Sequence, residues 1–151
     1  MALDILTILD HIESHAWASG HFQRVNRHEP KSAPGQGLSC SIWASGIYPV
    51  ASSGLDSTSA RLEFTVRLMQ NFVNDPEDLI DPSLIAALDA LYTAYSGDFT
   101  LAANVRQIDL LGAEGTPLSA NAGYVNQDNV NYRIFDITLP IIVNDVWSQA
   151  E

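Results

Sequence analysis

An alternation of hydrophobic and polar residues marks the clearest element of the chain, at positions 61–68. The apolar members are Leu62, Phe64, Val66 and Leu68, and the polar members are Arg61, Glu63, Thr65 and Arg67. Successive side chains of a β-strand point to opposite faces of the sheet. The pattern therefore predicts a strand that belongs to a sheet with one buried and one polar face.

Two segments carry the apolar spacing of amphipathic helices. The first starts at Asp4 and stops near Gly20, with apolar residues at Ile5, Ile8, Leu9, Ile12 and Ala16. The second is predicted to start with Asp81 as N-cap and Pro82 as first helical residue, and to end at Gly97. Its apolar positions are Leu84, Ile85, Leu88, Leu91, Tyr92 and Tyr95.

Further strands are expected at 38–50, 105–111, 118–125 and 130–143. In the first of these, Cys40, Ile42 and Ala44 share one face and Trp43 lies on the other. The last two are expected to form a hairpin through 126–129, and a change of phase near Ile134 and Phe135 indicates either a bulge or burial on both faces. Connecting loops are predicted at 26–37, 51–59, 75–81 and 112–117.

Strands that follow one another through short connections favour antiparallel pairing with helices on one side. We therefore expect an α+β fold with a mainly antiparallel mixed sheet flanked by two principal helices. The 151 residues are enough for one ordinary domain, and no linker divides the chain, so residues 1–151 are expected to form a single domain.

The charge balance excludes a protein that binds nucleic acid tightly. The chain has 18 acidic and seven basic residues and a net charge of −11, whereas tight binding to phosphates needs clustered Lys and Arg. The acidity fits either simple solubility or a surface that surrounds DNA without holding it. The start of the chain is acidic and unlike a secretory signal, and no apolar run is long enough to span a bilayer. The single cysteine, Cys40, is expected to be a small buried residue of a protein made and used in a reducing cytoplasm.

Candidate chemistry is sparse. His11 and His15 share a helix face, but Glu13 does not follow His11 directly as the H-E-x-x-H zinc motif requires, and no third ligand has supporting spacing. A solvated polar helix face is the preferred interpretation. His28 and Glu29 lie in a loop without a nucleophile elbow, and phosphate-binding loops are absent. The sequence therefore predicts no catalytic residue, no metal ligand and no cofactor.

Several strings, taken together and in order, carry a resemblance to a known family. They are RHEPKS at 27–32, SSGL at 52–55, TSAR at 58–61, DP at 81–82, AYSGDFTL at 94–101, IDLLG at 108–112 and IVNDVW at 142–147. With these strings the chain resembles the tail terminator proteins of long-tailed, non-contractile (siphovirus-type) bacteriophages that infect actinobacteria. The resemblance spans nearly the whole chain, and none of the strings is a catalytic fingerprint.

The resemblance implies a structural virion protein at the neck of the tail, assembled in the host cytoplasm. Such proteins form a ring, usually of six subunits, that caps the head-proximal end of the tail tube and stops its polymerisation. The implied partners are further copies of the chain, the tail tube protein and the head connector or head completion protein. Genome DNA passes through the lumen without specific binding, and no membrane is involved.

Interface residues are inferred from polar strand faces, loops and an aromatic residue near the end of the chain. They are His28, Glu29, Lys31, Arg61, Glu63, Arg67, Asn126, Asp128 and Trp147. Burial of Trp147 in a neighbouring subunit and packing of Trp147 against the first helix of the same chain both remain open.

Three other functions stay open beside a tail terminator. One is another head–tail connector, head-completion adaptor or tube-like protein of the same particle. Another is a small metal-dependent hydrolase that uses His11, His15 and an acidic residue. The last is a monomeric binding module with a groove formed by Trp147 and the loops.

Overall fold

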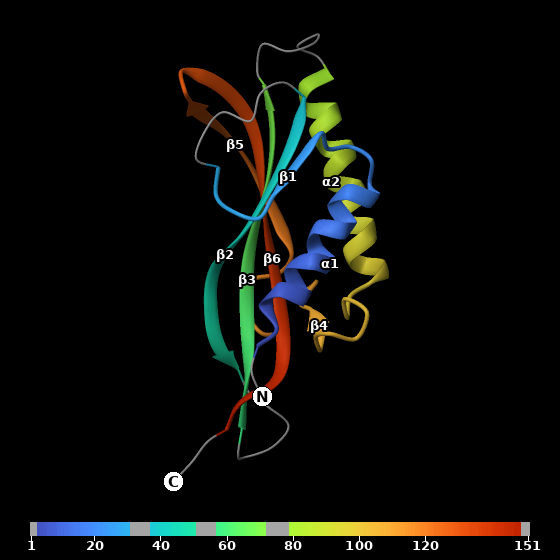
Figure 1. Ribbon diagram of the computed structural model, residues 1–151, viewed down its shortest axis with the longest axis vertical. Coiled ribbons are helices and arrows are strands. Elements are labelled where there is room, and N and C mark those ends of the chain that lie inside the picture. Colours follow the sequence, from blue (N-terminus) through green and yellow to red (C-terminus); the bar gives the residue numbers. More distant parts are fainter. Residues whose placement is uncertain (1–2, 31–36, 51–56, 72–78, 149–151) are drawn as a thin grey trace.

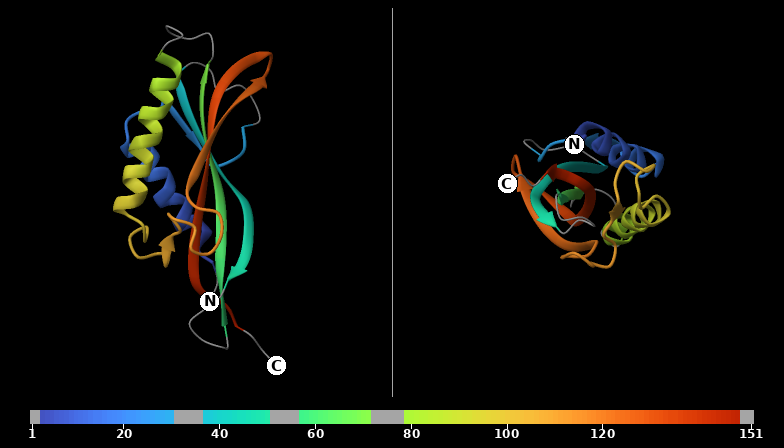
Figure 2. Two further views of the ribbon diagram at one scale, coloured as in Figure 1. Left: turned by 180° about the vertical axis from the view of Figure 1, so that it is seen from behind. Right: turned by 90° about the horizontal axis from the view of Figure 1, so that it is seen from below.

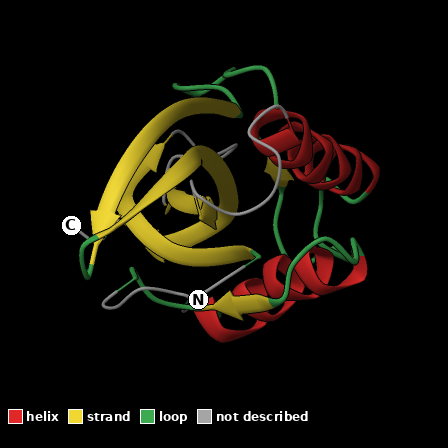
Figure 3. Ribbon diagram, turned by 90° about the horizontal axis from the view of Figure 1, so that it is seen from above, coloured by secondary structure: helices red, strands yellow, loops and turns green. Residues whose placement is uncertain are grey.

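The computed structural model describes residues 3–30, 37–50, 57–71 and 79–148. In these residues, two helices lie side by side against one curled, mixed and mostly antiparallel sheet of six strands (Figures 1 and 3). The expected α+β class is confirmed. The elements in chain order are α1 (Ile5–Ala18), β1 (Arg24–Asn26), β2 (Leu38–Val50), β3 (Ser57–Asn71), α2 (Ile80–Gly97), β4 (Gln107–Ile108), β5 (Ser119–Gln127) and β6 (Val130–Ser148).

Strand β6 is the central strand of the sheet and pairs with β3, β4 and β5. The strand order is β1-β2-β3-β6-β4, and β5 pairs with β6 beside this path. On one edge β6 pairs with β3 from Tyr132 to Ser148. On its other edge β6 pairs first with β5, as far as Thr138, and then with β4 at Ile141 and Ile142. Among the described strands, only β1 runs parallel to its neighbour, β2. A two-faced antiparallel sheet of this kind leaves one face for the helices and one for other contacts.

The helix-facing side of the sheet is the main core. Leu62 is 3% exposed and the other three alternating apolar residues of β3 are fully buried, as the period of two predicts. The apolar stripes of α1 and α2 cover them, and Cys40 and Ile42 of β2 complete the layer. Full burial of such side chains contributes about 1.5–3 kcal/mol each. The buried residues from the helices are Ile8, Ile12, Ala16, Ile80, Leu84, Ala87, Leu91 and Tyr95.

The start of α1 is the one the sequence predicts. Asp4 is the N-cap, and its carboxylate accepts hydrogen bonds from the backbone N–H of Thr7 at 3.2 Å and from the Thr7 hydroxyl at 2.7 Å. These two bonds lower the pKa of Asp4. The helix ends at Ala18, and Gly20 follows with a φ of +73°.

The predicted N-cap of α2 is wrong. The helix begins at Ile80 after Leu79, and no side chain caps it. Asp81 lies inside the first turn, where its carboxylate accepts a hydrogen bond from Nε of Arg133 in β6 at 3.0 Å. Ile80 is 4% exposed, so its burial favours a start two residues earlier than the polar pattern indicates. An acid in the first turn remains favourable to the helix dipole.

The predicted hairpin is confirmed with a tighter turn. Only Asp128 and Asn129 separate β5 from β6, and both have positive φ, +52° and +61°, as the tight two-residue hairpin turn requires. The phase change in β6 reflects burial on both faces, because Ile134 and Phe135 pair with Met69 and Leu68 without interruption. Ile134 joins a second small cluster with Met69 and Tyr132, while Phe135 packs against the main core.

Several strands differ from the expectation in their presence or their bounds. The segment predicted at 105–111 is a strand only at Gln107–Ile108, and β1 is too short for any hydrophobic pattern to reveal. β3 starts at Ser57, inside the predicted connector, where Ser57 pairs with Ser148. The rest of that connector, residues 31–36 of the predicted loop at 26–37 and residues 75–78 of the predicted loop at 75–81 lie outside the described residues.

Candidate assembly surfaces

The hairpin end of the molecule brings together predicted interface residues that are about a hundred positions apart in sequence. Gln127 donates a hydrogen bond from Nε2 to the backbone oxygen of Pro30 at 2.7 Å. This bond places the segment that carries His28 and Glu29 against the β5–β6 hairpin. His28, Glu29, Asn126 and Asp128 are all exposed there. Lys31, predicted beside them, lies outside the described residues.

The hairpin is rigidified by its own polar and aromatic contacts. Asn126 donates to Asn131 across the turn at 2.9 Å. The guanidinium of Arg133 lies 4.5 Å from the centre of the Tyr124 ring, and Tyr124 is 66% exposed. The hairpin end therefore presents an ordered polar tip with a supported aromatic side chain.

The second face of the sheet is less solvated than the alternating pattern predicts. Arg67 of β3 binds Asp136 of β6 through two hydrogen bonds of 2.7 and 3.1 Å, and its guanidinium lies 5.2 Å from the centre of the Trp43 ring. Arg67, Asp136 and Trp43 are half-buried. Because the sheet curls (Figure 2), its polar face is partly enclosed by the protein itself.

Arg61 is buried, contrary to the expectation of a solvated polar face. It is 3% exposed, and its Nη1 lies 2.6 Å from Oδ2 of Asp109, which is 2% exposed. Arg61 also donates to the backbone oxygen of Thr116 and, at 3.3 Å, to Glu63. Arg61 and Glu63, both predicted as interface residues, thus anchor a loop of their own chain. The sequence pattern did not single out Asp109.

Asp109 organises the loop that follows β4. Its carboxylate accepts hydrogen bonds from the backbone N–H of Ala113 at 2.8 Å and of Glu114 at 2.9 Å. Burial alone would raise the pKa of Asp109, but these N–H groups and the Arg61 guanidinium outweigh it and hold the pKa below its ordinary value. These contacts fix the conformation of the loop. Leu111, within the loop, is 94% exposed.

The far end of the sheet carries exposed apolar side chains. Figures 1 and 2 show β2, β3 and β6 running on past the helices toward the C-terminal end of β6. Trp147 is 39% exposed there, and Ile47 and Tyr48 of β2 are each 48% exposed. Strand β1 pairs with β2 only at Ser39–Ser41, and no other strand among the described residues pairs with that edge. Among the described residues, neither helix extends along this far end, which carries Ile47, Tyr48 and Trp147.

His11 and His15 do not form a solvated helix face. His15 Nε2 lies 2.8 Å from Oδ2 of Asp98, and His11 Nε2 lies 2.9 Å from Nδ2 of Asn104. Both histidines thus fasten α1 to the segment after α2. Partial burial would raise the pKa of Asp98, but the N–H of Ala102 and the His15 side chain outweigh it and lower that pKa.

The segment held by these histidines has an unusual backbone. Leu101, Ala102 and Ala103 have φ values of +47°, +56° and +66°, so three consecutive non-glycine residues are left-handed. Such residues each cost about 1–2 kcal/mol. Leu101 is fully buried, and the Ala102 N–H donates to Asp98 at 2.9 Å. Packing and capping thus offset the strain.

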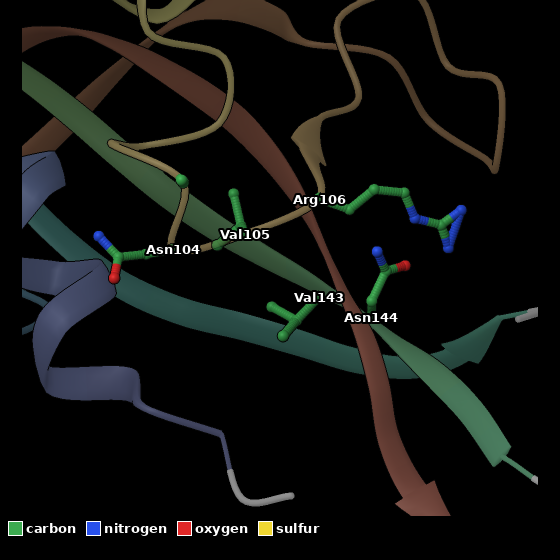
Figure 4. Close-up of a pocket in the computed structure, with 6 residues that line it drawn as sticks. Asn104, Val105, Arg106, Val143 and Asn144 are labelled. Atoms are coloured by element: carbon green, nitrogen blue, oxygen red, sulfur yellow. The ribbon is translucent and has the colours of Figure 1, made fainter.

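A pocket of about 290 Å³ lies beside this turn (Figure 4). It is located where the pairing of β6 with β4 ends, at Ile142. The backbone N–H of Arg106 donates to Ile142 at 2.8 Å and so fixes the pocket against β6. Its lining residues are Ala103, Asn104, Val105, Arg106, Val143 and Asn144.

The described residues offer no constellation for catalysis by a metal. Within 3–30, 37–50, 57–71 and 79–148, no three His, Cys, Asp or Glu side chains are placed to hold a metal ion. Neither described helix is long and apolar enough to cross a membrane. Cys40 is fully buried, and this burial raises the pKa of its thiol to about 12.

Solved structures similar to this chain come from a gene transfer agent virion and from an extracellular contractile injection system. One is a chain from the virion of a native gene transfer agent particle, with 12% identity, a TM-score of 0.39 and coverage of 87% of this chain and 90% of that one. Another is from the PVC sheath/tube terminator of an extracellular contractile injection system in its extended state. It has 11% identity and a TM-score of 0.45, and the match covers all of this chain but 60% of that one.

No protein-family model and no curated protein matches the chain. At identities of 11–12% and TM-scores below 0.5, the structural similarities concern the fold and assign no function.

Proposed function

We propose that this protein is a tail terminator of a long-tailed bacteriophage. In this role, copies of the chain form a ring, of six subunits, at the head-proximal end of the tail tube, within the neck of the virion. The ring stops polymerisation of the tail tube protein and offers a surface to the head connector. The ordered set of sequence strings from residue 27 to residue 147 supports this assignment.

The observation that carries the proposal is the far end of the sheet. Its strands extend past the helices (Figure 1), and three of its large side chains, Ile47, Tyr48 and Trp147, are exposed. Trp and Tyr are enriched among the residues that carry most of the binding energy of protein interfaces, and exposed apolar patches mark such interfaces. A subunit that is completed by neighbouring proteins accounts for them, whereas an isolated monomer leaves them in water.

The molecule also has two separate ends at which to meet partners. Strand β6 has 19 residues, which at about 3.3 Å per residue correspond to roughly 60 Å before twist and curl shorten it. The hairpin end, with His28, Glu29, Asn126 and Asp128, lies at its start, and Trp147 lies near its finish. Contacts with a tube on one side and a connector on the other suit such a subunit.

The net charge of −11 agrees with a ring that conducts DNA. An electronegative lumen repels the phosphate backbone, so the genome moves through without being trapped. Several of the basic side chains form ion pairs with acidic residues of the same chain. Arg27 binds Asp10 and Glu13, Arg61 binds Asp109, and Arg67 binds Asp136.

Removal of the gene tests the role directly. The terminator role predicts particles arrested before head–tail joining, with overlong tails in electron micrographs. Tails of normal length on headless particles would instead favour a head-completion or adaptor protein. Purified protein is expected as closed rings or monomers, and long tubes formed by the protein alone would contradict the proposal.

Substitution at the far end tests the observation that carries the proposal. Trp147→Ala is expected to abolish ring formation while the thermal unfolding of the monomer stays nearly unchanged. Trp17→Ala is the matched control, because Trp17 is 50% exposed on α1, away from the far end. If both variants lose ring formation equally, or if neither variant loses it, the far end is not part of the interface.

A further inference from the structure

The outer edge of β5 is a sheet edge that no other described strand covers. Strand β5 pairs with β6 at every residue from Ser119 to Gln127 without a bulge, and among the described strands it has no second neighbour. Figures 1 and 2 show the tip of the β5–β6 hairpin leaning away from α2. A sheet edge of this kind presents a row of backbone N–H and C=O groups with which a further strand can pair.

Strand β5 lacks the features by which proteins protect such an edge. Its sequence, SANAGYVNQ, contains no proline and none of the 18 acidic and seven basic residues of the chain. The opposite edge, β2, has Pro49, a register shift between Ala44 and Gly46, and β1 paired along Ser39–Ser41. Charged residues, proline, bulges and covering elements are the usual means of preventing contact between edges. The contrast indicates that the edge of β5 is an interface.

The hairpin turn determines which backbone groups of β5 point to this edge. Because the turn has two residues, Gln127 and Val130 form a hydrogen-bonded pair, and such pairs alternate along an antiparallel ladder. Residues of even number, such as Ala120 and Ala122, therefore direct their N–H and C=O groups away from β6. A strand that binds here has to match this alternation.

We propose that the β5 strands of two copies of this chain pair edge to edge, antiparallel, about a two-fold axis at Gly123. Gly123 is the midpoint of β5, so this register uses all nine residues of the strand. It also matches the alternation, because Ala122 of one copy lies opposite Tyr124 of the other, and both have even numbers. The contact does not depend on the proposed function.

Side-chain size makes β5 complementary to itself in this register. The first half of the strand has small side chains, at Ala120 and Ala122, and the second half has larger ones, at Tyr124 and Val125. Residues directly opposite each other lie on the same face. Tyr124, which is 66% exposed, therefore covers Ala122 of the second copy, and each Gly123 meets the other on the axis. A parallel pair in register would instead place small residues against small ones.

Charge also favours β5 as the contact between two copies. Two chains of net charge −11 repel each other, so an acid placed opposite an acid weakens a contact. Strand β5 brings no acid to the paired residues, and Asp128 lies beyond them in the turn. Arg133, 4.5 Å from the centre of the Tyr124 ring, is bound to Asp81 of its own chain. The contact therefore contains no uncompensated charge.

The two-fold contact is separate from the ring contact. A contact of this symmetry joins two copies and does not by itself close a ring of six. It lies at the hairpin end, which in the proposed function meets the tube or the connector. The second copy covers the edge of β5 in the free protein, in equilibrium with the dilute monomer, and is displaced when the hairpin end meets its partner in the virion.

A symmetric disulfide tests the register. The two Gly123 Cα atoms form a non-hydrogen-bonded pair about 4.5 Å apart, within the range that a disulfide spans. A Cβ on Gly123 lies 3.5 Å from Ile134, an ordinary contact, so Gly123→Cys is expected to fold. The oxidised full-length variant is expected to be a covalent dimer, and the native Cys40 stays silent because it is fully buried.

Asn121→Cys is the matched control, at an exposed position of the same strand. In the proposed register its two copies lie four residues apart along the strands, roughly 13 Å at 3.3 Å per residue, which is too far for a disulfide. Equal cross-linking of both variants would indicate random collision and would overturn the register.

Sedimentation of the Trp147→Ala variant, in which the ring contact is removed, is the second test. Its mass is expected to rise from monomer to dimer with concentration. Addition of Ala122→Lys is expected to abolish the rise, because a charge then lies on the edge, whereas Ala86→Lys, at an exposed position of α2, leaves it unchanged. Tyr124→Glu alone is also expected to weaken the dimer. A mixture of Ala122→Lys and Tyr124→Glu chains restores it, because the new lysine and glutamate lie opposite each other, and a misfolded variant does not give this result.

The outcomes separate the two proposals. No covalent dimer from Gly123→Cys and a mass independent of concentration overturn the β5 contact and leave the terminator role standing. A covalent dimer together with tails of normal length in the gene deletion supports the contact and overturns the terminator role. Loss of head–tail joining in Ala122→Lys without any dimer of the free protein would mean that β5 receives a strand of another virion protein, and it would overturn the pairing of two copies.

Discussion

Arg61 of β3 and Asp109, 48 positions later in the chain, form an ion pair of 2.6 Å in which neither side chain is more than 3% exposed. Removing one member leaves the other as an uncompensated buried charge. Asp109→Asn is therefore expected to lower the free energy of unfolding by about 3–5 kcal/mol, measured by urea denaturation. The double variant Arg61→Met with Asp109→Leu is expected to be more stable than Asp109→Asn alone, because no charge is left buried.

The ion pair of Arg67 and Asp136 is the matched control. Its side chains are 19% and 34% exposed, so solvent screens the interaction. Asp136→Asn is expected to cost about 1 kcal/mol or less. An equal cost for Asp136→Asn and Asp109→Asn would show that burial of the Arg61 pair has no special weight.

Acid should destabilise the protein through Asp98 and Asp109. The folded structure lowers the pKa of both carboxyls. Their stabilising contribution is therefore complete above the ordinary Asp pKa of about 3.9 and is lost as pH falls through the lower folded value. Urea midpoints measured from pH 6 to pH 2 are expected to decline mainly below about pH 4, and the Asp98→Asn variant should show a shallower decline. An unchanged slope in that variant would contradict the assignment to Asp98.

The left-handed turn should gain stability from glycine. Ala102 and Ala103 have φ values of +56° and +66°, which glycine adopts without steric cost. Ala102→Gly is expected to raise the free energy of unfolding by about 0.5–1 kcal/mol, after the extra chain entropy of glycine is counted. Ala86→Gly, at an exposed position inside α2, is expected to lower it by about 1 kcal/mol. Destabilisation by both substitutions would show that the turn is not strained.

Cys40 should be inert in the folded protein. It is fully buried, and burial raises the pKa of its thiol to about 12, so almost no reactive thiolate exists at neutral pH. A thiol reagent is expected to label the chain only at the rate of unfolding, and at once in denaturant. Rapid labelling of the native protein would place Cys40 at an accessible position.

Local patterns were sufficient to predict most of the elements. The alternation in β3, the amphipathic spacing of both helices and the hairpin near residue 128 depend on neighbours along the chain, and they lead to the α+β class. Periodicity reports which face of an element is apolar, because that face must be buried somewhere. Periodicity predicts the ends of elements less well. Helix α2 begins at Ile80, which is buried, although Asp81 is the better capping residue.

Contacts between distant segments followed from no local signal. Arg61 looks like any polar residue of an alternating strand until Asp109 folds over it, and His11 and His15 look solvated until Asn104 and Asp98 reach them. The same holds for exposure. Ile47, Tyr48 and Leu111 have apolar side chains that are exposed, because β2 extends past the helices and the loop turns Leu111 outward. Each of these outcomes depends on which surfaces the folded chain can cover, and that is a property of the whole structure.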